Sequence, residues 1–369
     1  MMAGHWDMQR LALTPDHETV PSAAGLQAIC YAGEPFQGHA TRVFAYLGVP
    51  ETPPPWPGVV LVHGGGGTAF AEWVRLWTAR GYAALAMDLA GCGPQRQPLP
   101  DGGPGQDNET KLLDPTTYWE DHWIYHSVAA ILRAHSLLAA VPGVDSARIA
   151  LTGISWGAIL TFIVAGLDRR FVCAVPVYGR AFLDEGGAMQ QAFAELAPTA
   201  RRHWREYCDP AAYLGKAALP ILFIASTNDI HSPLDAYQRT YRLVRGARTL
   251  SIRRGMQHGH PAGWAPAEIA LFTDHWLRGA PALPTIGEIS AAGKTFSAPI
   301  WTERPLVSGT LLYTTDRTTW PDRVWQEAPA TISVGQVSGL LPANVSAYFL
   351  AVTDAEGAYV SSPHVTDGD

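Results

Sequence analysis

The chain has 369 residues, of which 47% are hydrophobic and 16% charged, a balance typical of a globular protein with a sizeable core. The formal net charge of −7 and the lack of any Lys/Arg run argue against nucleic acid as a main partner. No stretch approaches the roughly 18 to 20 uninterrupted apolar residues that a membrane span needs, so no membrane partner is expected.

The first twenty residues, MMAGHWDMQRLALTPDHETV, have no apolar core of signal-peptide length, which favours a cytoplasmic location. The four cysteines lie far apart in the sequence, and none of them forms a C-x-x-C pair. Their spacing therefore indicates neither a zinc site nor a disulfide framework.

The first elements of the chain are short strands. Alternating patterns at 27–31 and 41–47 predict two strands, and the apolar run 58–64 predicts a buried one. A helix is expected at 69–81, closed by a glycine, and the next buried strand at 82–89. A loop rich in Gly and Pro follows.

Strands and helices keep alternating through the next part of the chain. Helices are expected at 116–140, from residue 156 onward, at 234–245 and at 265–279, with a helical insertion at 181–214. Strands are expected at 149–154, 173–179, 220–229 and 247–255. Because several of these strands are apolar throughout, they predict a mostly parallel sheet with helices on both faces.

The pattern changes after a proline-containing linker at 280–284. Short β-type runs separated by turn residues predict a small all-β sandwich of the immunoglobulin or fibronectin III kind at 284–369, following an α/β catalytic domain at 1–280. This sandwich could bind carbohydrate, mediate homo-oligomer formation, or cover part of the first domain.

The stretch GISWG places Ser155 between Gly153 and Gly157, where the strand ending at Ile154 meets a helix. A tight turn that happens to contain a serine would look the same. The pattern also fits a nucleophile elbow, in which a sharp turn exposes the serine hydroxyl and glycines relieve crowding.

Two later strand ends carry partners for this serine. Asp229 ends one strand, and His258 and His260 follow the next, so the chain order is Ser, Asp, His. A neutral imidazole can accept the serine proton, and a carboxylate can hold that ring in the correct tautomer. We favour His258 over His260 because it comes first after the strand and is followed by a glycine.

A glycine run after an earlier strand supplies main-chain donors. Acyl transfer builds negative charge on a carbonyl oxygen, which N–H groups must already face. We expect these donors at Gly65 and Gly66 and at the amide of Trp156. The run 64–69 also fits the dinucleotide fingerprint G-x-G-x-x-A, although two β-type stretches precede it and a dinucleotide would leave the serine, aspartate and histidine without a role.

These motifs together resemble the α/β-hydrolase superfamily, in its branch of dienelactone hydrolases, acetyl xylan esterases and prolyl-oligopeptidase-like enzymes. The resemblance covers about residues 25 to 280 and rests on the segments VHGGGG, DLAGCG, RIALTGISWG, ASTND and MQHGH. The acetyl xylan esterases that deacetylate cephalosporins carry a different oxyanion motif, so that subgroup is not matched.

Several other residues are candidates for substrate contacts. Tyr178 directly follows an inner strand, and His63 and His260 flank the expected site. The insertion 181–214 is either a lid over an acyl pocket or a surface excursion. His122 and His126 lie four residues apart on a helix, but without an HExxH motif we expect them to be structural, and we expect no metal site.

The sequence therefore predicts a serine esterase that acts on a small-molecule carboxylic ester through an acyl-enzyme, with no cofactor. A peptidase of the prolyl-oligopeptidase type would use the same groups, although its usual large β-propeller has no room in this chain. An NAD-binding oxidoreductase that uses the glycine loop is the second alternative.

Overall fold

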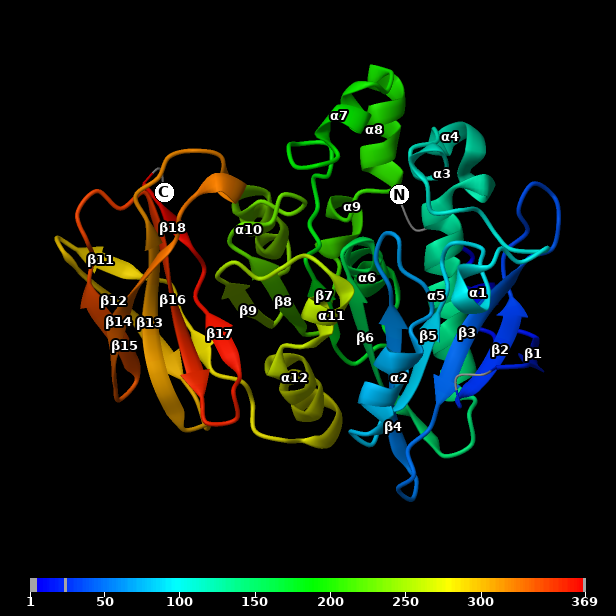
Figure 1. The fold of residues 1–369 in the computed structure, drawn as a ribbon, viewed down its shortest axis with the longest axis horizontal. Coiled ribbons are helices and arrows are strands. Elements are labelled where there is room, and N and C mark those ends of the chain that lie inside the picture. Colours follow the sequence, from blue (N-terminus) through cyan, green and yellow to red (C-terminus); the bar gives the residue numbers. More distant parts are fainter. Residues whose placement is uncertain (1–4, 23–24, 368–369) are drawn as a thin grey trace.

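The strands β1 to β9 form one twisted sheet at the centre of the computed structural model, which describes residues 5–22 and 25–367 (Figure 1). Their spatial order is β1-β2-β3-β5-β4-β6-β7-β8-β9, antiparallel as far as β5 and parallel from β5 to β9. The bounds are β1 (His17–Val20), β2 (Gln27–Ala32), β3 (Arg42–Gly48), β4 (Trp56–Val62), β5 (Ala83–Met87), β6 (Val144–Ile154), β7 (Ala174–Val177), β8 (Ile221–Ser226) and β9 (Arg248–Arg253).

Helices cover both faces of this sheet and bury a separate apolar cluster on each. One face carries α2 (Ala71–Thr78), α11 (His260–Trp264) and α12 (Ala267–Arg278). The other carries α1 (Met8–Leu11), α5 (Trp123–Ala139), α6 (Trp156–Leu167), α9 (Ala211–Leu214) and α10 (Leu234–Arg242). The predicted α/β class, with a mostly parallel sheet between helices, is confirmed.

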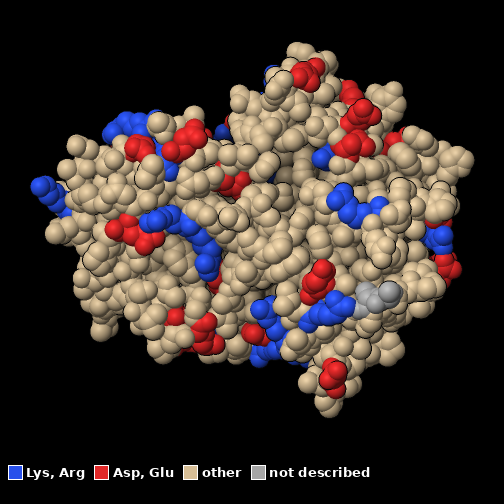
Figure 2. Space-filling view, viewed as in Figure 1, with Lys and Arg blue, Asp and Glu red and all other residues tan. Residues whose placement is uncertain are grey.

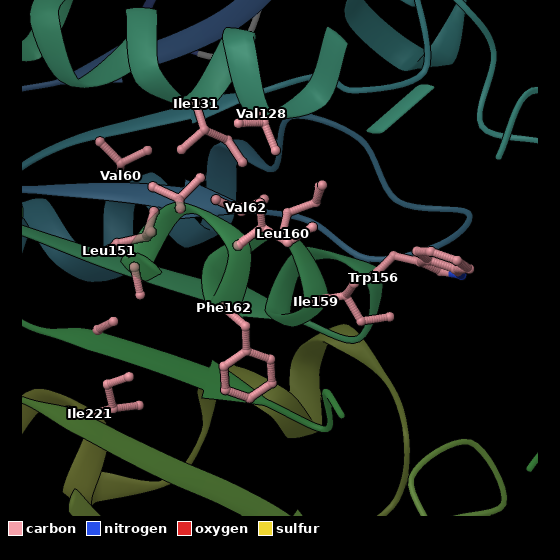
Figure 3. Close-up of a cluster of buried hydrophobic side chains, with 14 of the residues drawn as sticks. Val60, Val62, Val128, Ile131, Leu151, Trp156, Ile159, Leu160, Phe162 and Ile221 are labelled. Atoms are coloured by element: carbon pink, nitrogen blue, oxygen red, sulfur yellow. The ribbon is translucent and has the colours of Figure 1, made fainter. Parts of the chain in front are cut away.

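Helices α5 and α6 pack on the sheet and are almost wholly buried. In Figure 3, Val60 and Val62 of β4 lie close to Val128 and Ile131 of α5. All four side chains are fully buried. Burial of a Val or Ile side chain contributes on the order of 2 kcal/mol, so this layer holds α5 firmly against the sheet.

One predicted helix is interrupted. Instead of a continuous helix over 116–140, the chain forms α4 (Pro115–Tyr118), the 3₁₀ turn η2 (Trp119–Asp121) and then α5. His122 adopts an extended backbone between them, and its Nδ1 accepts the amide of Ile124, so it caps the start of α5. Because apolar residues keep helical spacing across His122, the sequence pattern does not reveal this break.

The remaining short elements lie in connections. The loop after β5 contains η1 (Pro94–Arg96) and α3 (Asn108–Lys111), and the insertion after β7 contains α7 (Gln190–Ala194) and α8 (Pro198–Tyr207), followed by α9. The first two insertion helices project above the carboxyl ends of the parallel strands in Figure 1. The insertion therefore contains three short helices.

The last quarter of the chain is built from antiparallel strands in two layers. Strands β11, β12 and β15 form one layer and β13, β16 and β17 the other, with β14 pairing to both. The bounds are β10 (Thr285–Ile286), β11 (Ser290–Ala292), β12 (Thr295–Trp301), β13 (Leu306–Thr314), η3 (Trp320–Asp322), β14 (Gln326–Ser333), β15 (Gln336–Leu340), β16 (Ala347–Asp354), β17 (Tyr359–Ser361) and β18 (Val365–Thr366). An apolar cluster of its own, which includes Phe296, Leu311 and Leu350, fills the space between the layers.

This β-sandwich lies directly against the edge of the central sheet. Strand β17 pairs with β9 through Ser361 and Leu250. The apolar cluster beneath α10 also continues into Trp325 and Phe349 of the sandwich. The two parts therefore share core as well as a strand pairing.

Candidate active site

Ser155 occupies the corner between β6 and α6 in a strained conformation. Its φ of 56° and ψ of −117° lie outside the regions that most side chains adopt. The flanking glycines are required by close approach, since a Cβ at Gly153 would lie 2.2 Å from the carbonyl oxygen of Gly157, and one at Gly157 would lie 2.1 Å from that of Val62. The geometry is that of a nucleophile elbow.

The imidazole of His258 joins Ser155 to Asp229. Its Nε2 lies 2.9 Å from the Ser155 hydroxyl, and its Nδ1 lies 2.8 Å from one carboxylate oxygen of Asp229. The other carboxylate oxygen accepts the main-chain amides of His231 and Ser232 at 2.8 and 3.3 Å. The three predicted residues therefore lie within hydrogen-bonding reach of one another, in the order needed for proton transfer from the serine.

Gly65 and Trp156 line the same cavity as Ser155, so their main-chain amides are candidate donors to an oxyanion. In the part of the chain that the structure describes, no hydrogen-bond acceptor is found for the amides of Gly65 and Trp156. Trp156 begins α6, where amides have no intrahelical partner. The amide of Gly66 donates instead to Gln106 Oε1 at 3.2 Å, so Gly65 is the better candidate donor of the two.

Comparisons with known proteins relate the chain to acetyl xylan esterases. Residues 11–185 match the family model of acetyl xylan esterases (AXE1). Among solved structures, the acetyl xylan esterase of Paenibacillus sp. R4 has a TM-score of 0.59 at 21% identity, and acetyl xylan esterase 1 of Thermoanaerobacterium sp. JW/SL YS485 has 0.57 at 18%. Each comparison covers 73% of this chain and 92% of the other.

An acylaminoacyl peptidase of Pyrococcus horikoshii is similar in fold, with a TM-score of 0.52 and 19% identity over 68% of this chain and 41% of that one. The chain has the α/β-hydrolase fold. The family match makes it a carboxylic ester hydrolase. The glycine loop at 64–67 differs from the oxyanion motif of one subgroup of acetyl xylan esterases. The loop nevertheless lies within the residues that match the acetyl xylan esterase model.

His63 and His260, which the sequence suggested as substrate contacts, hold the glycine loop instead. His260 Nε2 accepts the Gly64 amide at 2.9 Å. His63 is 1% exposed, accepts the Leu89 amide through Nε2, and donates from Nδ1 to the carbonyl oxygen of Gly64. Burial lowers the pKa of both rings to about 4, so both are neutral near pH 7. Neither ring lines the cavity beside Ser155.

That cavity has a volume of about 320 Å³ and a mixed lining. It is lined by Gly65, Ser155, Trp156, Ile159, Tyr178, Arg180, Leu183, Ala188, Met189, His231, Ser232 and His258. Leu183, Ala188 and Met189 come from the insertion, which therefore forms one wall. The buried Arg180 guanidinium fixes this wall by donating to carbonyl groups of residues 181–186 and to that of His231.

Aromatic rings on both sides hold the imidazole of His258. Tyr178, with a φ of 63°, packs against it at a centroid distance of 4.7 Å, and its hydroxyl donates to the carbonyl oxygen of Gln257. The ring of His231 lies 4.5 Å away. Burial and the nearby His258 lower the pKa of His231. The sequence analysis missed His231, although its position two residues after Asp229 is a usable signal.

The two histidines four residues apart on the predicted helix, His122 and His126, make structural contacts. His126 Nε2 pairs with the carbonyl oxygen of Glu120, and His122 lies next to the Cys208 thiol, so the two rings brace the start of α5.

Within residues 5–22 and 25–367, no group of three or more His, Cys, Asp or Glu side chains could hold a metal ion. No helix of these residues is long and apolar enough to cross a membrane. On the face in Figure 2, acidic and basic side chains are interspersed.

Proposed function

We propose that Ser155, His258 and Asp229 carry out the ester hydrolysis of this enzyme through an acyl-enzyme. His258 takes the serine proton as the hydroxyl attacks the ester carbonyl and then returns it to the departing alcohol. Asp229 orients the ring and stabilises its charged form. The observation that carries the assignment is the continuous chain of contacts at 2.9 and 2.8 Å from serine to carboxylate.

The oxyanion of the tetrahedral intermediate would lie between the amides of Gly65 and Trp156. Both belong to rigid parts of the fold, since Trp156 begins a buried helix and the glycine loop is held by His63 and His260. Donors fixed in this way need no reorganisation during the reaction, and the loss of one typically costs about 3 to 4 kcal/mol.

Acetyl esters of carbohydrates are the first substrates to test, because the two solved acetyl xylan esterases share the fold over most of their length. Four free cysteines among the described residues support the predicted cytoplasmic location. Division into a hydrolase domain at 1–280 and a β domain at 284–369, and formation of a homo-oligomer, stay predictions.

The test compares hydrolysis of 4-nitrophenyl acetate and of acetylated xylo-oligosaccharides by the wild type, Ser155→Ala and Asp229→Asn. We expect no acyl-enzyme turnover with Ser155→Ala and a loss in kcat on the order of 10⁴ with Asp229→Asn. Full activity in either variant would refute the assignment. Faster cleavage of an acylaminoacyl anilide than of the esters would favour the peptidase alternative.

A further inference from the structure

The side chain of Asn228, which immediately precedes Asp229, links the active site to the β-sandwich. The Nδ2 of Asn228 donates to the carbonyl oxygens of Pro321 at 2.9 Å and Arg323 at 2.8 Å. Both carbonyl groups belong to the turn at 319–325, between β13 and β14 of the sandwich. Both amide hydrogens of Asn228 are thus used across the boundary between the two parts of the fold.

The same side chain also links this turn to the loop that carries His258. The Oδ1 of Asn228 accepts the hydroxyl of Thr227 at 2.7 Å, and the Thr227 oxygen accepts the amide of Gly255 at 3.1 Å. Gly255 lies between the end of β9 and His258. An unbroken series of hydrogen bonds therefore runs from the sandwich to both loops that hold the acid and the base.

The turn at 319–325 is well fixed within the sandwich. The ring of Trp320 packs edge-on against His364, and the Arg323 guanidinium lies 3.8 Å from the Trp320 centroid. Trp325 is 5% exposed and contacts Phe349. The carbonyl groups that receive Asn228 therefore have fixed positions.

Ser155 is held in a different way. Its main-chain amide donates to Val177 within the central sheet, and its conformation is set by β6 and α6. A second contact from the sandwich, the ion pair between Arg254 and Glu327, again reaches the loop before His258. The sandwich thus supports the acid and the base, while the central sheet supports the nucleophile.

We infer that the C-terminal β-sandwich is a structural part of the catalytic site and that Asn228 is its positioning residue. Asn228 fixes the position of Asp229 because the two residues are adjacent in the chain. It supports the His258 loop through the hydrogen bonds of Thr227 and Gly255. A misplacement of about 1 Å in a catalytic group can cost on the order of 10² in rate, so this link has a measurable effect. The inference rests on the triad assignment proposed above.

The test uses the full chain and compares Asn228→Ala with Gln238→Ala. Gln238 also donates across the same boundary, but to the main-chain carbonyl oxygen of His364 at 2.7 Å and not to the turn at 319–325. We expect Asn228→Ala to lower kcat by about 10- to 100-fold with KM nearly unchanged. Gln238→Ala should keep the wild-type kcat. Asn228→Ser, which keeps one donor, should fall between Asn228→Ala and the wild type.

Rescue by the conservative variant separates positioning from general stability. A loss of kcat in Asn228→Ala at unchanged urea stability, partly restored in Asn228→Ser, marks a positioning role. Wild-type kcat in both Asn228 variants would overturn the inference. Full activity of Asp229→Asn would instead refute the triad assignment itself.

Discussion

His258 and His260 lie two residues apart and do different work. His258 bridges Ser155 and Asp229, whereas His260 accepts the amide of Gly64 and packs on Phe70 at a centroid distance of 4.7 Å. The first ring exchanges a proton with the substrate in our proposal. The second ring only has to accept a hydrogen bond, and its lowered pKa keeps it in the neutral form that can do so.

Substitution of the two histidines should separate these roles. We expect His258→Ala to lower kcat on the order of 10⁴ or more, because among residues 5–22 and 25–367 no other side chain is hydrogen-bonded to the serine hydroxyl. His260→Ala should lower it by no more than about 10², through displacement of the glycine loop. His260→Gln, which keeps an acceptor for Gly64, should recover most of that loss. Steady-state kinetics check this, and a larger effect at His260 than at His258 would reverse the assignment.

Sequence reasoning singled out Ser155, Asp229 and His258 because each follows a recognisable strand. It could not tell which of the consecutive amides in the glycine loop stays free, since that depends on acceptors contributed by His260 and Gln106 from distant segments. Asn228 was also invisible, because its partners lie 93 and 95 residues further along the chain.

The strand-to-helix corner is the element on which the site depends. Strand β6 and helix α6 meet so closely that the backbone of Gly157 touches that of β4. A helix in this position directs its first amides at the serine hydroxyl side of the turn. Packing against β4 therefore requires glycine at 157. The same glycine also leaves the Ser155 hydroxyl exposed.

A stability measurement can test this packing requirement. We expect Gly157→Ala to lower the free energy of unfolding by about 3 kcal/mol or more, because the new methyl group would lie 2.1 Å from the carbonyl oxygen of Val62. Gly259→Ala is the matched control, since a Cβ there meets nothing within 4 Å and the backbone is extended. Urea denaturation of the two variants gives the comparison, and equal stability would contradict the account.

The local periodicity of apolar residues predicts the alternation of strands and helices, and the α/β class follows from that alternation. The same periodicity does not predict the cap at His122, because apolar residues continue on both sides of it. The role of the insertion was left open between a lid and an excursion. In the structure three of its apolar side chains line the cavity, held there by Arg180, which a pattern of local sequence does not reveal.

At the scale of the whole molecule, buried histidines make stability depend on pH. Burial lowers the pKa of His122 to about 3 and that of His63, His135 and His260 to about 4, below the ordinary value of 6.5. Between pH 4 and 6.5 the unfolded chain therefore binds protons that the folded chain does not. Stability from these groups is complete above pH 6.5 and is lost as the pH falls toward 4.

Asp88 acts in the opposite direction, because burial raises its pKa to about 6 and unfolding near pH 5 releases its proton. Among these five groups, the four histidines take up protons and Asp88 releases one, so their balance on unfolding at pH 5 is a net uptake. Thermal unfolding followed from pH 7.5 to 4.5 should show a Tm that falls steeply below pH 6.5. A flat Tm over that range would show that these rings are not buried as neutral groups.

The sandwich and the hydrolase part form one functional unit in this account, since they share core, a strand pairing and the contacts of Asn228. The sequence marked the boundary by its change of pattern but left the role of the sandwich open. Composition alone does not show which surface a small β domain presents to its neighbour.

The central claim, that Ser155 is an activated nucleophile, is tested most directly by labelling with a fluorophosphonate and mass spectrometry of the intact protein. We predict one adduct per wild-type chain, located on Ser155, and no adduct on a folded Ser155→Ala variant. Labelling of that variant, or an adduct on another residue of the wild type, would contradict the claim.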